Sequence, residues 1–124
     1  MSQPPELGLY LALLVTHWVG DFVLQTNRLA ANKSKSNAVL SQHVLIYTCC
    51  LATTSVILCG PSLAWMAFTA GNGLFHFATD YCTSRWSARL YAKQDWRKFF
   101  VLIGFDQLIH QITLGFTMWL AFYR

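Results

Sequence analysis

Four hydrophobic segments, each about 20–25 residues long, limit this chain to one kind of fold. They run at about 7–26, 38–59, 62–82 and 99–123. Each is long enough to cross about 30 Å of hydrocarbon as an α-helix. A helix in lipid satisfies its own backbone hydrogen bonds, which an open strand cannot do. The sequence therefore predicts an all-α protein, an antiparallel four-helix transmembrane bundle.

The composition fits a single integral membrane domain over residues 1–124. Of the 124 residues, 55% are hydrophobic and only 11% are charged, whereas soluble domains carry about 25% charged residues. The net charge of +4 does not indicate nucleic-acid binding, because the chain offers neither a basic face nor an aromatic stacking platform. We expect no nucleic-acid partner and expect the lipid bilayer to be the surrounding medium.

The basic residues predict how the chain is oriented. Nearly all of them lie in two connections, 27–37 and 83–98, and the turn between the second and third segments has none: they are Arg28, Lys33, Lys35, Arg85, Arg89, Lys93, Arg97 and Lys98. Short loops rich in Lys and Arg stay in the cytoplasm. We therefore expect a multi-pass protein of the inner (cytoplasmic) membrane, with both connections cytoplasmic and both termini on the opposite side.

The connection 84–98 has two readings. Trp86, Leu90 and Lys93 recur at helical spacing with arginines beside them, which is typical of an interfacial helix lying on anionic headgroups. The same spacing also fits a cytoplasmic extension of the third helix. Both alternatives stay open at this point.

Ionisable residues inside the hydrophobic segments carry the functional signal. His17 and Asp21, His76 and Asp80, and Asp106 and His110 form three pairs at i, i+4, so the members of each pair face the same way, one turn apart. An ionisable group in the middle of a bilayer costs at least about 2–3 kcal/mol, so it rarely persists there without a partner and a task.

These polar residues also fall at matching depths. Counting helical rise from each segment end predicts three layers: His17, Asn72 and His110 near the midplane; Asp21, His43, His76 and Asp106 one turn nearer the cytoplasm; and Gln25 and Asp80 at the mouth. We infer a polar cavity inside the bundle that opens to the cytoplasm. Mutual pairing of His and Asp within each helix is the alternative that involves no site.

Four histidines and three carboxylates are a ligand set for zinc first, and for manganese or iron as alternatives. Facing helices of a bundle build metal sites from such spacings. The predicted roles are as follows: His17, His76, Asp80 and His110 as metal ligands; Asp21 and Asp106 as catalytic bases; and His43, Gln25, Asn72, Gln107 and Lys33 around the ligands or against substrate. The positive-inside rule alone explains Lys33 equally well, and a hydrogen bond between helices explains Asn72.

One motif pattern resembles a known family. It reads His17-x-x-x-Asp21-Phe22-x-x-Gln25, Asn32-Lys33, His43, His76-x-x-x-Asp80 and Asp106-Gln107-x-x-His110, and it resembles the small bacterial and phage membrane family known as domain of unknown function 3307. The resemblance implies a four-span inner-membrane protein and supplies no activity. A looser likeness, to membrane-bound metal-dependent hydrolases, is analogy only.

Three functional hypotheses fit these residues. The first is an intramembrane metal-dependent hydrolase that acts on a lipid-linked or amphiphilic substrate from the cytoplasmic side. The second is a proton relay or transporter that uses the same His-Asp cluster and needs a homo-oligomer. The third is a phage or bacterial modulator that binds a host membrane protein and keeps its polar core for folding.

Overall fold

The computed structural model describes residues 6–123, and every regular element among them is helical. The elements are α1 (Glu6–Trp18), the π-helical turn η1 (Val19–Val23), α2 (Asn27–Asn32), α3 (Asn37–Cys59), α4 (Leu63–Ala92) and α5 (Trp96–Phe122). The all-α prediction is confirmed.

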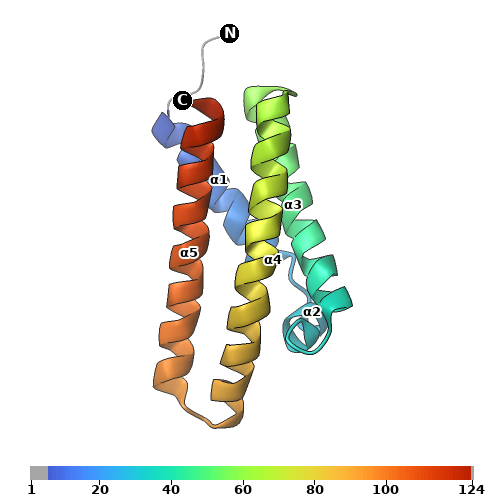
Figure 1. The fold of residues 1–124 in the computed structure, drawn as a ribbon, viewed down its shortest axis with the longest axis vertical. Helices are drawn as coiled ribbons and strands as arrows, with labels where there is room; N and C mark the ends of the chain where they lie inside the picture. Colours follow the sequence, from blue (N-terminus) through green and yellow to red (C-terminus); the bar gives the residue numbers. More distant parts are fainter. Residues whose placement is uncertain (1–5, 124) are drawn as a thin grey trace.

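The four long helices close a ring. α1 packs against α3 and α5, and α4 packs against the same two helices from the other side. α4 and α5 run antiparallel along their length, while α1 crosses obliquely behind them (Figure 1). The start of α1 and the end of α5 lie at one end of the bundle, and α2 and the α4–α5 turn lie toward the other.

Three helical stretches are long and apolar enough to cross a membrane: Glu6–Val23, Asn37–Cys59 and Trp96–Phe122. This finding indicates a membrane protein. α4 is not among them, since Asn72, His76 and Asp80 lower the hydropathy of its central part. The predicted fourth span therefore stays a prediction.

The predicted separate interfacial helix within 84–98 is wrong. α4 continues without a break to Ala92, well past the predicted end at residue 82, and the alternative of an extended third helix is confirmed. No Gly or Pro interrupts residues 83–92. The chain reverses only at Gln94, which has φ 57°, and Asp95 then caps α5 by accepting a hydrogen bond from the backbone N–H of Lys98.

The first segment also departs from the predicted regular span. α1 ends at Trp18, and the π-helical turn η1 carries the chain only to Val23. Thr26 then caps α2 by accepting a hydrogen bond from the backbone N–H of Leu29, so the connection predicted as a loop contains a short helix. This helix places Lys33 at its end, below the bundle interior.

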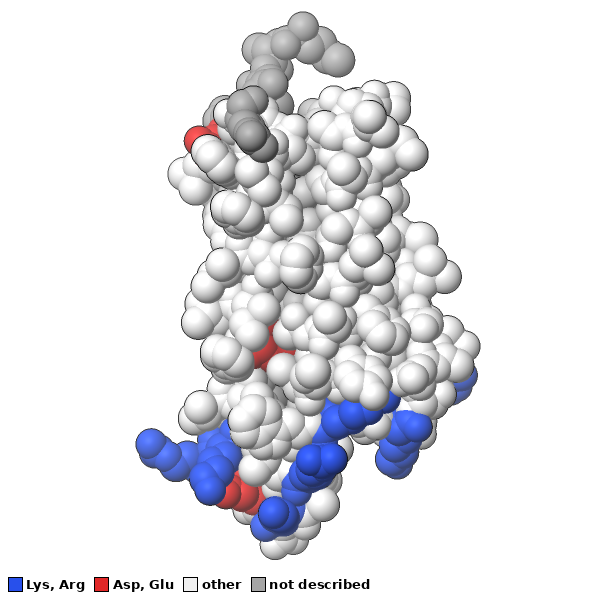
Figure 2. Space-filling view, in the orientation of Figure 1, with Lys and Arg blue, Asp and Glu red and all other residues white. Residues whose placement is uncertain are grey.

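Apolar and polar side chains divide the interior between them. The apolar core lies toward the end where α1 begins and α5 ends, and it consists of Leu9, Leu13, Tyr47, Leu51, Phe68, Leu114 and Met118. Lysines and arginines gather around the opposite end (Figure 2). Between these two regions the ring encloses buried His and Asp side chains.

Small residues set the closest approaches between helices. A Cβ on Gly73 of α4 would lie 2.7 Å from Thr48 Oγ1 of α3, and a Cβ on Gly20 would lie 3.2 Å from the Cα of Tyr47. Membrane helices pack closely where small residues remove the side chain from the contact. These two positions therefore hold α4 and η1 against α3, which carries His43.

The Gly73 contact makes a stability prediction. We expect Gly73→Ala to lower the free energy of unfolding in detergent by about 1–3 kcal/mol, because the added methyl group overpacks the helix contact. Thr48 cannot easily turn away, since its hydroxyl donates to the carbonyl of Val44 at 2.7 Å. Gly71→Ala is the control, as nothing lies within 4 Å of its Cβ position. Equal stability of the two variants would contradict the tight contact.

Candidate metal site

Ionisable side chains from all four sides of the ring meet in its interior. Six are buried to 4% exposure or less: His17, Asp21, His43, His76, Asp80 and His110. They come from α1, η1, α3, α4 and α5. The predicted convergence of imidazoles and carboxylates in one buried place is therefore found.

Four of these residues form a compact group that we call the central cluster: Asp21, His43, His76 and Asp80. Asp21 Oδ1 lies 3.0 Å from His43 Nε2 and 3.3 Å from His76 Nε2. Asp80 Oδ2 lies 3.3 Å from His43 Nε2 and 3.4 Å from His76 Nε2. The two Nε2 atoms are 3.2 Å apart.

These separations match the edges of a tetrahedral metal site. A tetrahedral ion with ligand distances of about 2.0–2.1 Å holds its ligand atoms about 3.3–3.4 Å apart. The four nitrogen–oxygen separations and the one nitrogen–nitrogen separation in the central cluster span 3.0–3.4 Å. Two imidazole nitrogens and two carboxylate oxygens are thus arranged as a nearly complete coordination shell.

Hydrogen bonds alone fit the central cluster less well. At most one of the two facing Nε2 atoms can direct a hydrogen toward the other. The Nδ1 atoms of His43 and His76 are buried without a hydrogen-bond partner among residues 6–123, and they stay so in either arrangement. A cation between the four ligand atoms would use both Nε2 lone pairs and both carboxylate oxygens at once.

Ring stacking fixes the orientation of His76. Its ring lies between the rings of Tyr47 and His110, with centroid distances of 4.0 and 4.2 Å and interplanar angles of 25° and 19°. Metal-bound histidines usually donate their other N–H to an acceptor that holds the ring. Here aromatic packing holds the His76 ring in its orientation instead, because Nδ1 of His76 has no acceptor among the described residues.

A second set of contacts lies beside the central cluster. Gln107 Nε2 donates to Asp21 Oδ2 at 3.2 Å and to Asp106 Oδ2 at 3.0 Å, while its Oε1 lies 2.9 Å from His17 Nε2. The Thr83 hydroxyl lies 2.6 Å from Asp106 Oδ1. Asp21, Asp106 and His110 could themselves hold an ion, but the Gln107 amide already bridges its two carboxylates.

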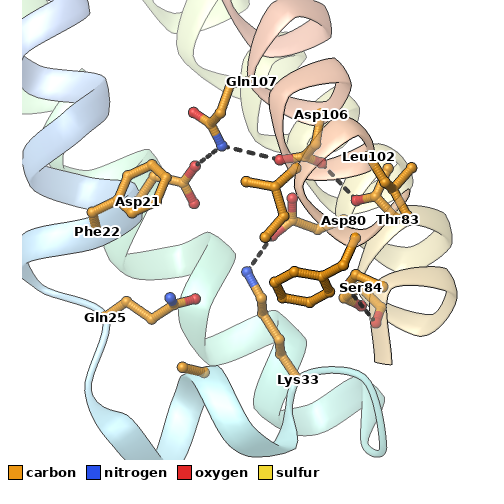
Figure 3. Close-up of a pocket in the computed structure, with 14 residues that line it drawn as sticks. Asp21, Phe22, Gln25, Lys33, Asp80, Thr83, Ser84, Leu102, Asp106 and Gln107 are labelled. Carbon is orange, nitrogen blue, oxygen red and sulfur yellow. Dashed lines mark hydrogen bonds and ion pairs between the residues drawn. The ribbon is translucent and has the colours of Figure 1, made fainter. Parts of the chain in front are cut away.

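A cavity of about 260 Å³ adjoins the central cluster toward the basic end of the bundle. Figure 3 shows Asp21, Asp80 and Asp106 directed toward it, with Gln107 at one side and Lys33 reaching in from the end of α2. Lys33 Nζ lies 3.1 Å from Asp80 Oδ2. The cavity gives the buried carboxylates a route to a ligand.

The structure groups the predicted ligands differently from the sequence prediction. His76 and Asp80 lie in the central cluster, but Asp21 and His43 complete it in place of His17 and His110. His17 faces the Tyr47 hydroxyl at 3.2 Å and the Gln107 amide. His110 contacts Asp80 through the other carboxylate oxygen, Oδ1, at 3.1 Å. The ligand roles themselves stay predictions.

The remaining predicted residues divide between the cavity and the helix contacts. Gln25 and Lys33 line the cavity. Asn72 lies away from the cluster, where its amide donates to the carbonyl of Phe68 and to Thr117 Oγ1. It acts between helices, which was the simpler of its two readings.

Sequence reasoning missed Tyr47 and Thr83. Tyr47 follows His43 by four residues on α3, and its ring packs on His76. Thr83 follows Asp80 by three residues on α4 and bonds Asp106. The helical spacing that singled out the His-Asp pairs applies to both, so extending it to hydroxyl side chains would have found them.

Comparison with known proteins identifies a family and no activity. The family model described as "Protein of unknown function (DUF3307)" matches residues 9–122, a range that contains the whole site. No curated protein and no solved structure matches the chain significantly. The resemblance seen in the motif pattern is confirmed, and the function has to be argued from the site.

The Tyr47 hydroxyl provides a test of the site geometry. We expect Tyr47→Phe to lower the free energy of unfolding by about 1–3 kcal/mol, because His17 Nδ1 loses its buried partner, while the ring stays against His76. Thermal unfolding in detergent measures this change. Tyr91→Phe is the matched control, since Tyr91 is 59% exposed. Identical melting of both variants would mean that the Tyr47 hydroxyl makes no such bond.

Proposed function

The chain belongs to the DUF3307 family, and we propose that it is an intramembrane metal-binding protein that hydrolyses an amphiphilic substrate. The observation that carries this proposal is the spacing of the central cluster, with two imidazole nitrogens and two carboxylate oxygens 3.0–3.4 Å apart. Neutral pairing of His and Asp needs no such four-way convergence. A divalent cation requires it.

We place the bundle across the inner membrane with α4 as its fourth span. α4 turns Asn72, His76 and Asp80 into the ring, and α3 and α5 pack along it. The basic end in Figure 2 would face the cytoplasm, as the positive-inside rule requires. The arginines on the extended end of α4 would then lie near anionic headgroups.

The ligand set favours zinc as the bound metal, with manganese or iron as alternatives. Mixed imidazole and carboxylate donors suit all three metals. Two carboxylates neutralise the charge of a divalent ion, which matters because Asp21 and Asp80 are 3% and 2% exposed. A net charge in so dry a place would be costly.

Hydrolysis is the chemistry that this arrangement serves best. A divalent metal held by Asp21, His43, His76 and Asp80 would supply a Lewis acid, and with a water molecule as a fifth ligand it would lower the pKa of that water toward about 7. Asp106 is the general base in our proposal, because it lines the cavity and is held by Thr83 and Gln107. Gln107 couples this carboxylate to Asp21, which positions both around the same volume.

The apolar core argues against a proton relay through the bundle. The polar contacts extend from Lys33 through Asp80, His43, Asp21 and Gln107 to His17 and Tyr47. Beyond Tyr47 the buried residues are the apolar core and the uncharged Ser55, Thr69 and Asn72, with no buried carboxylate or imidazole among the described residues. A relay needs polar partners across the full thickness of the membrane, so a site that opens at one end fits better.

Metal analysis tests the proposal directly. We expect purified wild-type protein, prepared with metal present, to contain close to one divalent transition metal per chain by mass spectrometry. His43→Ala and Asp80→Ala should lose that metal because each removes a ligand. His17→Ala should keep it, since His17 lies outside the central cluster. Gel filtration confirms that each variant is folded.

Two results would contradict the metal assignment. Wild-type protein with no bound metal would end the proposal. Loss of metal in folded His17→Ala together with retention in His43→Ala would instead restore the ligand set predicted from sequence. The two outcomes separate the existence of a site from the identity of its ligands.

A second experiment tests hydrolysis. We expect metal-loaded protein to cleave chromogenic amphiphilic esters, and Asp106→Asn to lower kcat about 100-fold or more while keeping the metal, because it removes the general base. Asp95→Asn is the control, because Asn also caps a helix and Asp95 lies at the start of α5, outside the cavity. Absence of any esterase activity in metal-loaded protein would reject the hydrolase while leaving metal binding intact.

A further inference from the structure

The cavity beside the central cluster is bounded by elements whose backbones stay apart, although side chains such as Asp21 of η1 and Gln107 of α5 contact each other. No Cα atom of η1 or α2 lies within 8 Å of a Cα atom of α4 or α5. The cavity nevertheless has lining residues on all four of these elements. It therefore fills a separation between the backbones of η1 and α2 on one side and those of α4 and α5 on the other, which we call the lateral separation.

The lining of the cavity has two chemical faces. The apolar face is made by Phe22, Phe99, Leu102 and Ile103. The polar face is made by Gln25, Lys33, Thr83, Ser84 and Ser87, together with the site residues Asp21, Asp80, Asp106 and Gln107. Phe22 is 46% exposed on the outside of η1, so the apolar face continues to the surface that would meet lipid. A ligand with one polar end and one apolar end matches this division.

Polar atoms at the inner face lack partners. Gln25 Oε1 and Ser84 Oγ are buried without a hydrogen-bond partner among residues 6–123. Buried polar atoms normally have one. In Figure 3, Gln25 and Lys33 extend toward the same space beside Asp80. A ligand oxygen atom would accept a hydrogen bond from the Ser84 hydroxyl, whereas Gln25 Oε1 is itself an acceptor and needs a ligand O–H, such as that of a protonated phosphate.

Lys33 faces three carboxylates in this space, those of Asp21, Asp80 and Asp106. Among residues 6–123 it is the only cation that lines the cavity, and its ammonium group pairs with Asp80 Oδ2 at 3.1 Å. Only a metal ion that neutralises Asp21 and Asp80 would make the space favourable for an anion. A divalent ion on Asp80 would take that oxygen and repel the ammonium group. With metal bound, Lys33 becomes available for a negative group in the cavity, next to the metal.

The volume limits what can enter. Pockets for complete small molecules usually hold about 300–1,000 Å³, and this cavity holds about 260 Å³. It can take a compact headgroup but not an extended chain. The chain of an amphiphile would have to remain outside, in the lateral separation.

We propose that the cavity binds the phosphate group of an amphiphile, with Lys33 and Ser84 contacting its oxygen atoms and the chain leaving sideways between η1 and α5. This inference rests on the proposed function, because the bound metal releases Lys33 from Asp80. It names the substrate class as a phosphate-bearing lipid or detergent-like molecule taken directly from the inner leaflet.

Binding of two phosphate probes tests the inference. Metal-loaded protein in dodecyl maltoside micelles, which carry no phosphate, is titrated with dodecyl phosphate and, separately, with inorganic phosphate, and binding is followed by phosphorus NMR. We expect dodecyl phosphate to bind more tightly. Lys33→Gln should weaken both probes about tenfold or more, the loss of one charge-assisted hydrogen bond. Lys35→Gln is the control, because Lys35 is exposed and lies outside the cavity lining.

A bulky residue in the lateral separation distinguishes headgroup from chain. Ile103→Trp should weaken dodecyl phosphate and leave inorganic phosphate unchanged, which also shows that the variant is folded. Leu108→Trp, on the exposed face of α5, should change neither. Equal affinity of wild-type protein for the two probes would overturn the sideways path, and equal binding by Lys33→Gln would overturn the phosphate site.

Metal content, measured on the same samples, separates the two proposals. Protein that holds its metal but binds neither probe would overturn this inference alone. Protein without metal would overturn the proposed function and this inference with it. We expect Lys33→Gln to hold metal at or above the wild-type level, because it removes a cation that competes for Asp80.

Discussion

Neutralisation of two buried carboxylates is the constraint on which the rest of this structure depends. Asp21 and Asp80 are almost inaccessible, and an uncompensated charge in such a place costs several kcal/mol. Their partners come from other helices: His43 from α3 contacts both, and Lys33 reaches Asp80 from α2. The contacts that compensate the charge therefore also fix how the helices sit against one another.

Helical spacing was enough to predict which faces turn inward. Both i, i+4 pairs on α4 and α5 are in contact in the structure, with His76 and Asp80 at 3.4 Å and His110 and Asp106 at 3.4 Å. The family, the all-α fold and the meeting of imidazoles with carboxylates followed from the same pattern. The helical spacing of polar residues in the sequence determines roughly which face of each helix points inward. It does not determine the exact rotation of that helix against its neighbours.

That rotation decided which histidine reaches which carboxylate. His43 was predicted only to surround the ligands, yet it lies at the centre, because Gly20 and Gly73 allow η1 and α4 to approach α3 closely. The π-helical turn at Val19–Val23 adds to this effect by redirecting Asp21 toward His43. Such turns occur often at functional sites. Such turns depend on tertiary packing, so no local sequence pattern predicted the one at Val19–Val23.

The polarity of α4 has a consequence for how the protein is made. On the proposed topology, α4 is the span that a translocon would release into lipid least readily by itself, since Asn72, His76 and Asp80 lower its hydropathy and polar residues oppose insertion. The chain between Cys59 and Leu63 is a tight turn, with Gly60 at φ 74°. α3 and α4 are therefore best inserted together as a helical hairpin, and α5 must follow quickly to shield the remaining polar face. The short turn between α3 and α4 therefore serves membrane insertion as well as the finished bundle.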